Sequence, residues 1–360
     1  MISQIRKLKV RSVPCTVPYQ RHCTMATDRT ESAKSNSWCL AQELFAALPT
    51  FRLKVGVIHY NALLAAYGKS AHWRQALSHF EELHMKTQLQ PDVITYNTTI
   101  SAVKQHWQAA LCLFQGMRRS KIEPDVVSYS AVMSSCEKGG QWQLSLNLFL
   151  AMAKSLIRPN LISYSVLLSS FEKGGQWQLA VSFFALMVSS LIQPNNISYN
   201  AIISSCEKGR QWQAALSIFH AMQLASHQPD VISYSAVLSS FEKGRQWQPA
   251  LIMLENMIEV RVTPHVISYN AVMSACENGR QWQHAWRTFE AIVDAELEPS
   301  VISYNAVMSA CEKAGQWQVA LYLFNEMPQM KLLPDPISRQ TAISSCERGA
   351  QWQLALSFFI

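Results

Sequence analysis

Val266–Ser300 reads VISYNAVMSACENGRQWQHAWRTFEAIVDAELEPS, and most of the chain consists of edited copies of this 35-residue stretch. Val301–Asp335 opens with the same VISYNAVMSACE, a truncated copy begins at Pro336, and earlier copies begin at Val57, Val93, Val126, Leu161, Asn196 and Val231. A fixed period of this length predicts a solenoid, a stack of small units none of which can bury its own apolar face. Because the copies share one plan, the function is to be sought in the positions at which they differ.

Each copy predicts two helices. The first runs through SYNAVMSACEK, where apolar residues recur at helical spacing and the serine at the third position of the copy is a candidate N-cap. A glycine turn such as Gly139-Gly140 ends this helix. The second helix has one apolar face and a small residue that permits close approach of neighbouring helices: Ala180, Ala215, Ala250, Ala285 and Ala320. Proline closes each copy and fixes the turn into the next, so the fold class is all-α, built of stacked helix-turn-helix repeats.

The chain divides by composition and by repeat register. Residues 1–21 are basic and free of acidic residues, which is typical of an organelle transit peptide, with a disordered basic tail as the alternative. Residues 22–56 form a degenerate repeat that we expect to cap the array, residues 57–335 hold eight repeats, and residues 336–360 form a truncated ninth. For this last repeat, either the gene model is incomplete or a partner covers the apolar end. In the shortened second repeat, Val93–Asp125, we expect the shortening to fall in the turn between the helices.

The net charge of +7 is unevenly distributed. Five positive charges lie in residues 1–21, so the other 339 residues carry a net charge of only +2. A protein that binds polyanions without selectivity is usually more basic, so any nucleic-acid binding here must rest on placed contacts. No uninterrupted apolar run approaches the roughly 18 residues of a membrane-spanning helix, and we expect no membrane insertion.

Two columns of residues are expected to serve packing. The eleventh position of the repeat holds Cys136, Cys206, Cys276, Cys311 and Cys346, and Phe171 and Phe241 take the same position in other copies. A position that accepts cysteine or phenylalanine is a buried apolar one, with a metal or redox role as the alternative, and reduced cysteines indicate an intracellular compartment. The tryptophans that open the second helices are in phase with its apolar face, which favours packing over base stacking: Trp38, Trp73, Trp107, Trp142, Trp177, Trp212, Trp247, Trp282, Trp317 and Trp352.

Written out in full, the repeat resembles the pentatricopeptide repeat. The pattern VISYNAVMSACEK…GQWQLALxLFxxM…PD has the 35-residue length, a V-x-x-Y-N-x-x-I-like first helix, an ALxLFxxM-like second helix and a closing P-D. The tetratricopeptide repeat shares the helical-hairpin plan, but its W-x-x-L-G-x-x-Y opening is absent. The resemblance covers roughly residues 57–360. It implies a right-handed α-solenoid that binds single-stranded RNA in mitochondria or plastids, each repeat reading one base from the inner groove.

The resemblance also implies which residues contact the RNA. In the family, the second residue of a repeat, usually aliphatic, sandwiches the base; these residues are Ile58, Ile94, Val127, Ile162, Ile197, Ile232, Ile267 and Ile302. The fifth and last residues select the base through its Watson–Crick edge; these pairs are Asn61/Asp92, Asn97/Asp125, Ser130/Asn160, Ser165/Asn195, Asn200/Asp230, Ser235/His265, Asn270/Ser300 and Asn305/Asp335. Helix capping is the alternative, but it does not account for a polar fifth position among apolar neighbours.

Carried over pair by pair, the family's code predicts the target 5′-UUAAUNCU-3′. Uracil lies opposite each Asn/Asp pair and adenine opposite each Ser/Asn pair. A pyrimidine, taken as cytosine, lies opposite Asn270/Ser300, and the base opposite Ser235/His265 stays open.

A column of cations occupies the thirteenth position, with Asn278 as the exception: Lys69, Lys138, Lys173, Lys208, Lys243, Lys313 and Arg348. In the family, a lysine at this position can contact the RNA backbone. The alternative is a solvated helix end, where a cation is favoured by the helix dipole. The sequence leaves both interpretations open.

The motifs of phosphate-binding loops, dinucleotide folds, zinc deaminases and paired-cysteine zinc sites are absent from the sequence, so we predict no enzyme, no cofactor and no metal. The leading hypothesis is an organellar RNA-binding protein that supports processing, stability, splicing, editing or translation of a transcript, together with other RNA-processing proteins. The alternatives are a protein-interaction scaffold whose groove holds a peptide, and a nonfunctional fragment of a longer repeat protein.

Overall fold

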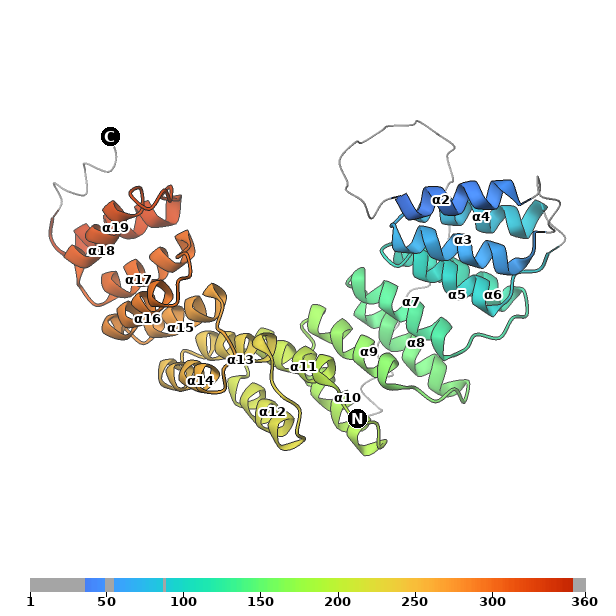
Figure 1. Ribbon diagram of the computed structural model, residues 1–360. Helices are drawn as coiled ribbons and strands as arrows, with labels where there is room; N and C mark the ends of the chain where they lie inside the picture. The colour runs from blue at the N-terminus through green and yellow to red at the C-terminus, as the bar shows by residue number, and fades with distance from the viewer. Residues whose placement is uncertain (1–35, 49–54, 87–88, 352–360) are drawn as a thin grey trace. The chain divides into compact units, whose positions relative to one another are not determined.

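The computed structural model describes residues 36–48, 55–86 and 89–351 (Figure 1). Within these ranges the chain contains eighteen helices and no strand, which confirms the all-α prediction. Three parts of the chain lie outside the described residues: the basic segment 1–21, the first part of the degenerate repeat, and residues 352–360, where the second helix of the truncated repeat was predicted to begin at Trp352.

Two series of helices alternate along the chain. The first helices of the repeats are α3 (Val57–Lys69), α5 (Val93–Ala102), α7 (Val126–Lys138), α9 (Leu161–Lys173), α11 (Asn196–Lys208), α13 (Val231–Lys243), α15 (Val266–Asn278), α17 (Val301–Lys313) and α19 (Pro336–Arg348). The second helices are α2 (Asn36–Ala47), α4 (Trp73–Lys86), α6 (Trp107–Arg119), α8 (Trp142–Lys154), α10 (Trp177–Ser189), α12 (Trp212–Leu224), α14 (Trp247–Glu259), α16 (Trp282–Asp294) and α18 (Trp317–Glu326).

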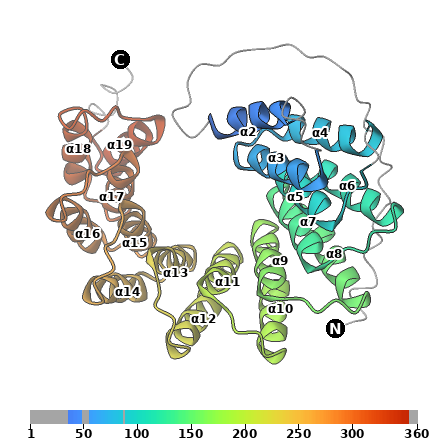
Figure 2. The ribbon, with the colours of Figure 1, turned by 45° about the vertical axis from the view of Figure 1, so that its right-hand side comes forward.

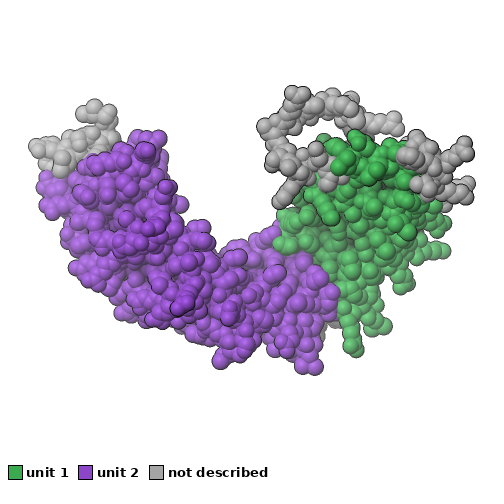
Figure 3. Space-filling view, viewed as in Figure 1, with its two compact units in different colours: residues 1–139, 150–158 green, residues 140–149, 159–360 purple. Residues whose placement is uncertain are grey.

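The described chain forms two compact units (Figure 3), residues 1–139 with 150–158 and residues 140–149 with 159–360. In both units each first helix packs against the first helix of an adjacent repeat and against at least one second helix that neighbours it in the chain. In unit 2, the first helices α11, α13, α15 and α17 follow the inner side of the unit's curve and α12, α14, α16 and α18 the outer side (Figure 2). Each unit is therefore a two-layered stack, as a solenoid requires.

The helix starts differ from our expectation in one respect. The last residue of each repeat, and not the third-position serine, is the N-cap of the next first helix. Asp230 has an extended backbone, and its carboxylate accepts a hydrogen bond from the Ser233 backbone N–H at 2.9 Å. Ser233 lies inside α13, and its hydroxyl accepts from the Asp230 backbone N–H at 3.3 Å, which completes a capping box. The prediction of a serine N-cap was wrong because the helix begins at Val231, two residues before the serine.

The tryptophan column packs across the repeat boundary. A Cβ built on Gly209 would lie 2.3 Å from Trp177 Cδ1, so the indole rests directly on the turn that ends the next first helix. The same contact recurs at Gly139, Gly174, Gly244, Gly279 and Gly349 with the tryptophan of the preceding repeat. The following residue has a left-handed backbone, with φ of 64° at Gly175 and 56° at Arg210. The tryptophans therefore pack against the following repeat, in agreement with a packing role.

The cysteine column lies in the core. Cys136, Cys206, Cys276, Cys311 and Cys346 are free thiols and have no exposed surface. Burial raises the pKa of the Cys136 thiol to about 12 and that of Cys206 to about 11. Burial disfavours the thiolate, which is the nucleophilic form, so these cysteines fill space between the helix layers.

The shortened second repeat also differs from our expectation. Its first helix, α5, has 10 residues, whereas α3 and α7 have 13. The shortening therefore comes out of the C-terminal turn of the helix and not out of the connection, which runs from Val103 to His106. The first residues of α5, from Val93 to Asn97, keep the register of the other repeats, so the shortening does not affect the start of the helix.

Candidate nucleic-acid interface

An exposed aliphatic side chain stands at the second position of every described first helix. The exposed fractions run from 57% at Val127 to 81% at Ile58. The other members of this column are Ile94, Ile162, Ile197, Ile232, Ile267, Ile302 and Ile337. Single exposed apolar residues are common on protein surfaces, but these recur at one position of every repeat, which makes them candidates for contact with a ligand.

The fifth residue of a repeat meets the last residue of the same repeat beside this row. Asn200 Nδ2 donates to the Asp230 carboxylate at 3.2 Å, although the two residues are 30 positions apart in the chain. Three further Asn/Asp pairs make the same contact, at 3.5 Å for Asn61/Asp92, 3.1 Å for Asn97/Asp125 and 3.1 Å for Asn305/Asp335. The pairing arises because the last residue caps the next first helix, which packs beside the helix that carries the asparagine.

The aspartates of these pairs are held ionised. Partial burial acts to raise the pKa of Asp230, but hydrogen bonds from Ser233 and Asn200 together outweigh it and leave the pKa below its ordinary value. The same balance lowers the pKa of Asp92 and Asp125, and at Asp335 the backbone N–H of Ser338 is the largest cause of the lowering. Each pair therefore presents an amide donor next to a carboxylate acceptor.

The remaining pairs are built differently. Ser165 and Ser235 are smaller, and each exchanges a hydrogen bond of 2.9 Å with the third-position serine of the next repeat, Ser198 or Ser268. Asn195 and Asn160 cap their helices by accepting from a serine backbone N–H at 2.9 and 3.0 Å.

His265 and Asn270 depart further from the Asn/Asp arrangement. His265 is exposed and makes no side-chain cap bond. Asn270 accepts from the hydroxyl of Ser303, while its partner Ser300 caps α17. Ser130 is buried on α7.

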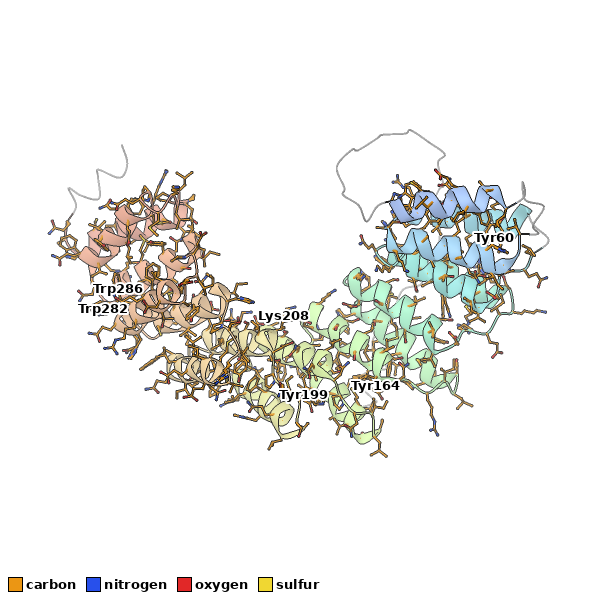
Figure 4. All side chains as sticks on the ribbon, in the orientation of Figure 1. Tyr60, Tyr164, Tyr199, Lys208, Trp282 and Trp286 are labelled. Carbon is orange, nitrogen blue, oxygen red and sulfur yellow. The ribbon has the colours of Figure 1, made fainter. Side chains whose placement is uncertain are left out.

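The thirteenth-position cations form a ladder with glutamates, an arrangement that neither sequence interpretation included. Lys208, which Figure 4 labels, has its Nζ 3.0 Å from Glu172 of the preceding repeat. The pairs Lys243–Glu207, Lys313–Glu277 and Arg348–Glu312 repeat the contact at 2.6, 2.7 and 3.2 Å. Asn278 replaces the lysine at one rung and donates instead to the Glu242 backbone carbonyl at 3.4 Å. Burial raises the pKa of Glu242, with Lys243 of its own helix opposing the rise. The ladder pairs the cations at the ends of α11, α13, α17 and α19 with glutamates.

A match to a family model places the chain among known proteins. The model of the PPR repeat family matches residues 55–105, 91–138, 124–173, 159–208, 194–243, 264–311 and 299–348. The chain belongs to the pentatricopeptide repeat family. The matched ranges take in the described first helices from α3 to α19 and the glycine turn that follows most of them.

Individual relatives of this pentatricopeptide repeat protein match over shorter stretches. A pentatricopeptide repeat-containing protein of Arabidopsis thaliana is 40% identical over 63 residues, which are 18% of this chain and 11% of the relative. The small ribosomal subunit protein mS78 of the same plant is 38% identical over 63 residues, 18% of this chain and 16% of the relative. The chain thus matches only a small part of the length of either protein.

The fold matches that of a solved pentatricopeptide repeat protein. PPR10 in complex with an 18-nt psaJ RNA element superposes with a TM-score of 0.51 at 18% identity, over 89% of this chain and 56% of that one. This similarity confirms the α-solenoid prediction.

The repeat array carries one further feature that the sequence reasoning missed. Trp286 is outside the tryptophan column and replaces the leucine or valine of other repeats. With Trp282 of the same helix (Figure 4) and Tyr322 of α18 it lines an open hollow of about 760 Å³ on the second helices of unit 2. Trp286 Nε1 donates to Glu290 at 2.7 Å, and the signal that could have found the hollow is the tryptophan out of register.

Two absences concern the described residues alone. No group of three or more His, Cys, Asp or Glu side chains there is placed to hold a metal ion. None of the described helices combines the length and apolar character that crossing a bilayer would need.

Proposed function

We propose that this protein binds single-stranded RNA in a sequence-selective way, one nucleotide per repeat, and that it is a binding protein and not an enzyme. The observation that carries the proposal is the repeated contact between the fifth residue and the last, as in Asn200 and Asp230, beside an exposed aliphatic residue. The solved complex of the similar PPR10 with RNA supports the ligand class.

The chemistry of each repeat suits an unpaired base. The exposed side chains of Ile197 and Ile232 offer apolar surfaces against which the faces of a base can pack, and between them the pair Asn200/Asp230 offers N–H donors and carboxylate acceptors. Single-stranded RNA exposes both the faces and the Watson–Crick edge of its bases, whereas a duplex hides them. Uracil, with two carbonyl acceptors and one N–H donor, complements an amide next to an ionised carboxylate.

The proposed target is 5′-UUAAUNCU-3′, read from the repeat that begins at Val57 to the repeat that begins at Val301. Occupancy of such a site would support processing, stability, splicing, editing or translation of a transcript, in concert with other RNA-processing proteins. An organellar location, mitochondrion or plastid, rests on the basic, acid-free composition of residues 1–21.

RNA selection from a random pool with the full chain tests the proposal. We expect recovery of a motif related to UUAAU, and weaker binding as salt rises, because RNA phosphates release counterions on binding. Replacing Asn200 by Ser, or Asn270 by Ser, should change the preferred base at one nucleotide only. Enrichment of no sequence, or an unchanged preference in both variants, would overturn the proposal.

The alternative function is a protein-interaction scaffold. The hollow lined by Trp282, Trp286 and Tyr322 favours it, because exposed aromatic residues are frequent in protein interfaces and these lie on the second helices, away from the row of exposed aliphatic residues. Retention of a protein partner by the full chain, lost on replacing Trp286 by Leu and accompanied by no RNA preference, would support the scaffold instead.

A further inference from the structure

The hydrogen bonds of the fifth-position asparagines extend into the next repeat. Ser233 donates its hydroxyl to Asn200 Oδ1 at 2.6 Å, and Ser128, Ser303 and Ser338 do the same for Asn97, Asn270 and Asn305 at 2.6, 2.7 and 2.6 Å. These serines occupy the third position of the following repeat and have no exposed surface. They are therefore out of reach of a ligand but in direct contact with the proposed base-selecting amide.

An amide side chain has a donor end and an acceptor end that a half-turn exchanges. The choice between them decides which base edge an asparagine can recognise, so something must hold the amide in one orientation. At Asn200 two groups do so: the Asp230 carboxylate attracts Nδ2 and the Ser233 hydroxyl bonds Oδ1. At Asn270 the last residue is Ser300, and Ser303 is the one side-chain partner of the amide among the described residues.

The first repeat shows the arrangement in which the hydroxyl does not bond the amide. Its next third-position residue is Thr95, which contacts the Asp92 carboxylate at 2.7 Å, as Ser233 contacts Asp230 at 2.9 Å, but makes no bond to the asparagine. Asn61 Oδ1 is buried and has no hydrogen-bond partner among the described residues, and its Nδ2 is 3.5 Å from Asp92. The amide of Asn61 is therefore held on one side only, by a longer contact than in the other Asn/Asp pairs.

We propose that the third-position serine of the following repeat is a positioning residue for base selection, so that recognition of one base takes three residues from two adjacent repeats. The proposal rests on the proposed RNA-binding function. It assigns the role to Ser128, Ser233, Ser303 and Ser338, and it makes Asn270 the asparagine most dependent on its serine.

The test compares Ser303→Ala with Ser268→Ala in the full chain. Ser268 is as buried as Ser303 and shares a 2.9 Å hydrogen bond with Ser235, but it bonds no asparagine side chain. Ser268→Ala therefore controls for the loss of a buried hydroxyl without disturbing an amide. Dissociation constants are measured for RNAs that carry C, U, A or G at the seventh nucleotide of 5′-UUAAUNCU-3′. We expect Ser303→Ala to reduce discrimination there by about tenfold, because the amide now turns freely. Ser268→Ala should leave that discrimination unchanged.

Two further variants keep the proposal falsifiable if Ser303→Ala folds poorly. Ser233→Ala should lower discrimination at the fifth nucleotide less than Ser303→Ala does at the seventh, because Asp230 still holds Asn200. Thr95→Ser should raise discrimination at the first nucleotide, since a serine hydroxyl bonds the amide in the other asparagine repeats.

The outcomes distinguish a failure of this proposal from a failure of the proposed RNA-binding function. Absence of any base preference in the unaltered protein would overturn RNA readout itself. A preference that Ser303→Ala retains in full, together with an unchanged first nucleotide in Thr95→Ser, would overturn the role of the serines alone.

Discussion

Two adjacent repeats of unit 2 have nearly the same backbone but different polar contacts. In Asn196–Asp230 the asparagine, the capping aspartate and the next serine form one connected network, and Glu207 pairs with Lys243. In Val231–His265 the fifth residue is Ser235, the last is an exposed histidine without a side-chain cap bond, and Glu242 faces Asn278 in place of a lysine.

The comparison separates what the fold needs from what the proposed site needs. Both repeats bury the same tyrosine, small-residue and apolar columns, as Tyr199 and Tyr234 show (Tyr199 is labelled in Figure 4). The helix α15 forms behind His265 as regularly as α13 forms behind Asp230, so the capping carboxylate is not required for the helix. A column that the fold does not require can vary from repeat to repeat, as the last residue does.

The largest expected effect comes from exchanging the pairs. The double variant Ser235→Asn/His265→Asp installs an amide next to a carboxylate and should create a uracil preference at the sixth nucleotide. The double variant Asn200→Ser/Asp230→His should abolish the uracil preference at the fifth. Each change amounts to roughly 10- to 100-fold in the ratio of dissociation constants for matched RNAs, measured by fluorescence anisotropy. If the base preferences at the fifth and sixth nucleotides do not change in the double variants, the residue pairs do not select the base.

An intermediate effect concerns stability. His265→Asp should supply the missing cap of α15 and stabilise unit 2 by about 1 kcal/mol at pH 7, whereas Asp230→Ala should cost about 1 kcal/mol, measured by urea unfolding. The folded pKa of Asp230 is lowered, so its contribution is present above the unfolded value of about 3.9 and is lost as the pH falls through the folded value. The cost of Asp230→Ala should therefore shrink below about pH 4. A cost that does not depend on pH would show that the carboxylate charge plays no part.

The smallest expected effect concerns the ladder. Asn278→Lys should place an ammonium near Glu242, as Lys243 lies near Glu207, and lower the raised pKa of Glu242. Because such pairs are half-exposed, the gain in unfolding free energy should be no more than about 0.5 kcal/mol. Titration of the glutamate by NMR measures the pKa directly, and an unchanged pKa of Glu242 in Asn278→Lys would show that the added ammonium does not pair with it.

The periodicity of the sequence was sufficient to predict the fold. Family resemblance singled out the fifth and last residues, and these lie in contact in the four Asn/Asp repeats. Tyrosine, cysteine and alanine columns recur in phase, so their burial follows from the repeat alone. The ladder was not predictable in this way, because Lys208 and Glu172 are 36 positions apart and their contact depends on how far one helix is offset along the next. Ser233 was misread as a cap, since its hydroxyl bonds both its own helix start and the preceding repeat.

The capping box across the repeat boundary has a consequence for engineering. A chimaera joined between Asp230 and Val231 would take Asn200 and Asp230 from one parent and Ser233 from the other, and would divide a bonded cluster between them. A join in the turn at Gly209-Arg210 would likewise separate Asn200 from Asp230 and Ser233, whereas a join between Ser233 and Tyr234 leaves both that cluster and the Ser235–Ser268 bond undivided. The cassette that keeps each polar cluster in one piece therefore begins at the tyrosine in the fourth position of one repeat and ends at the serine in the third position of the next.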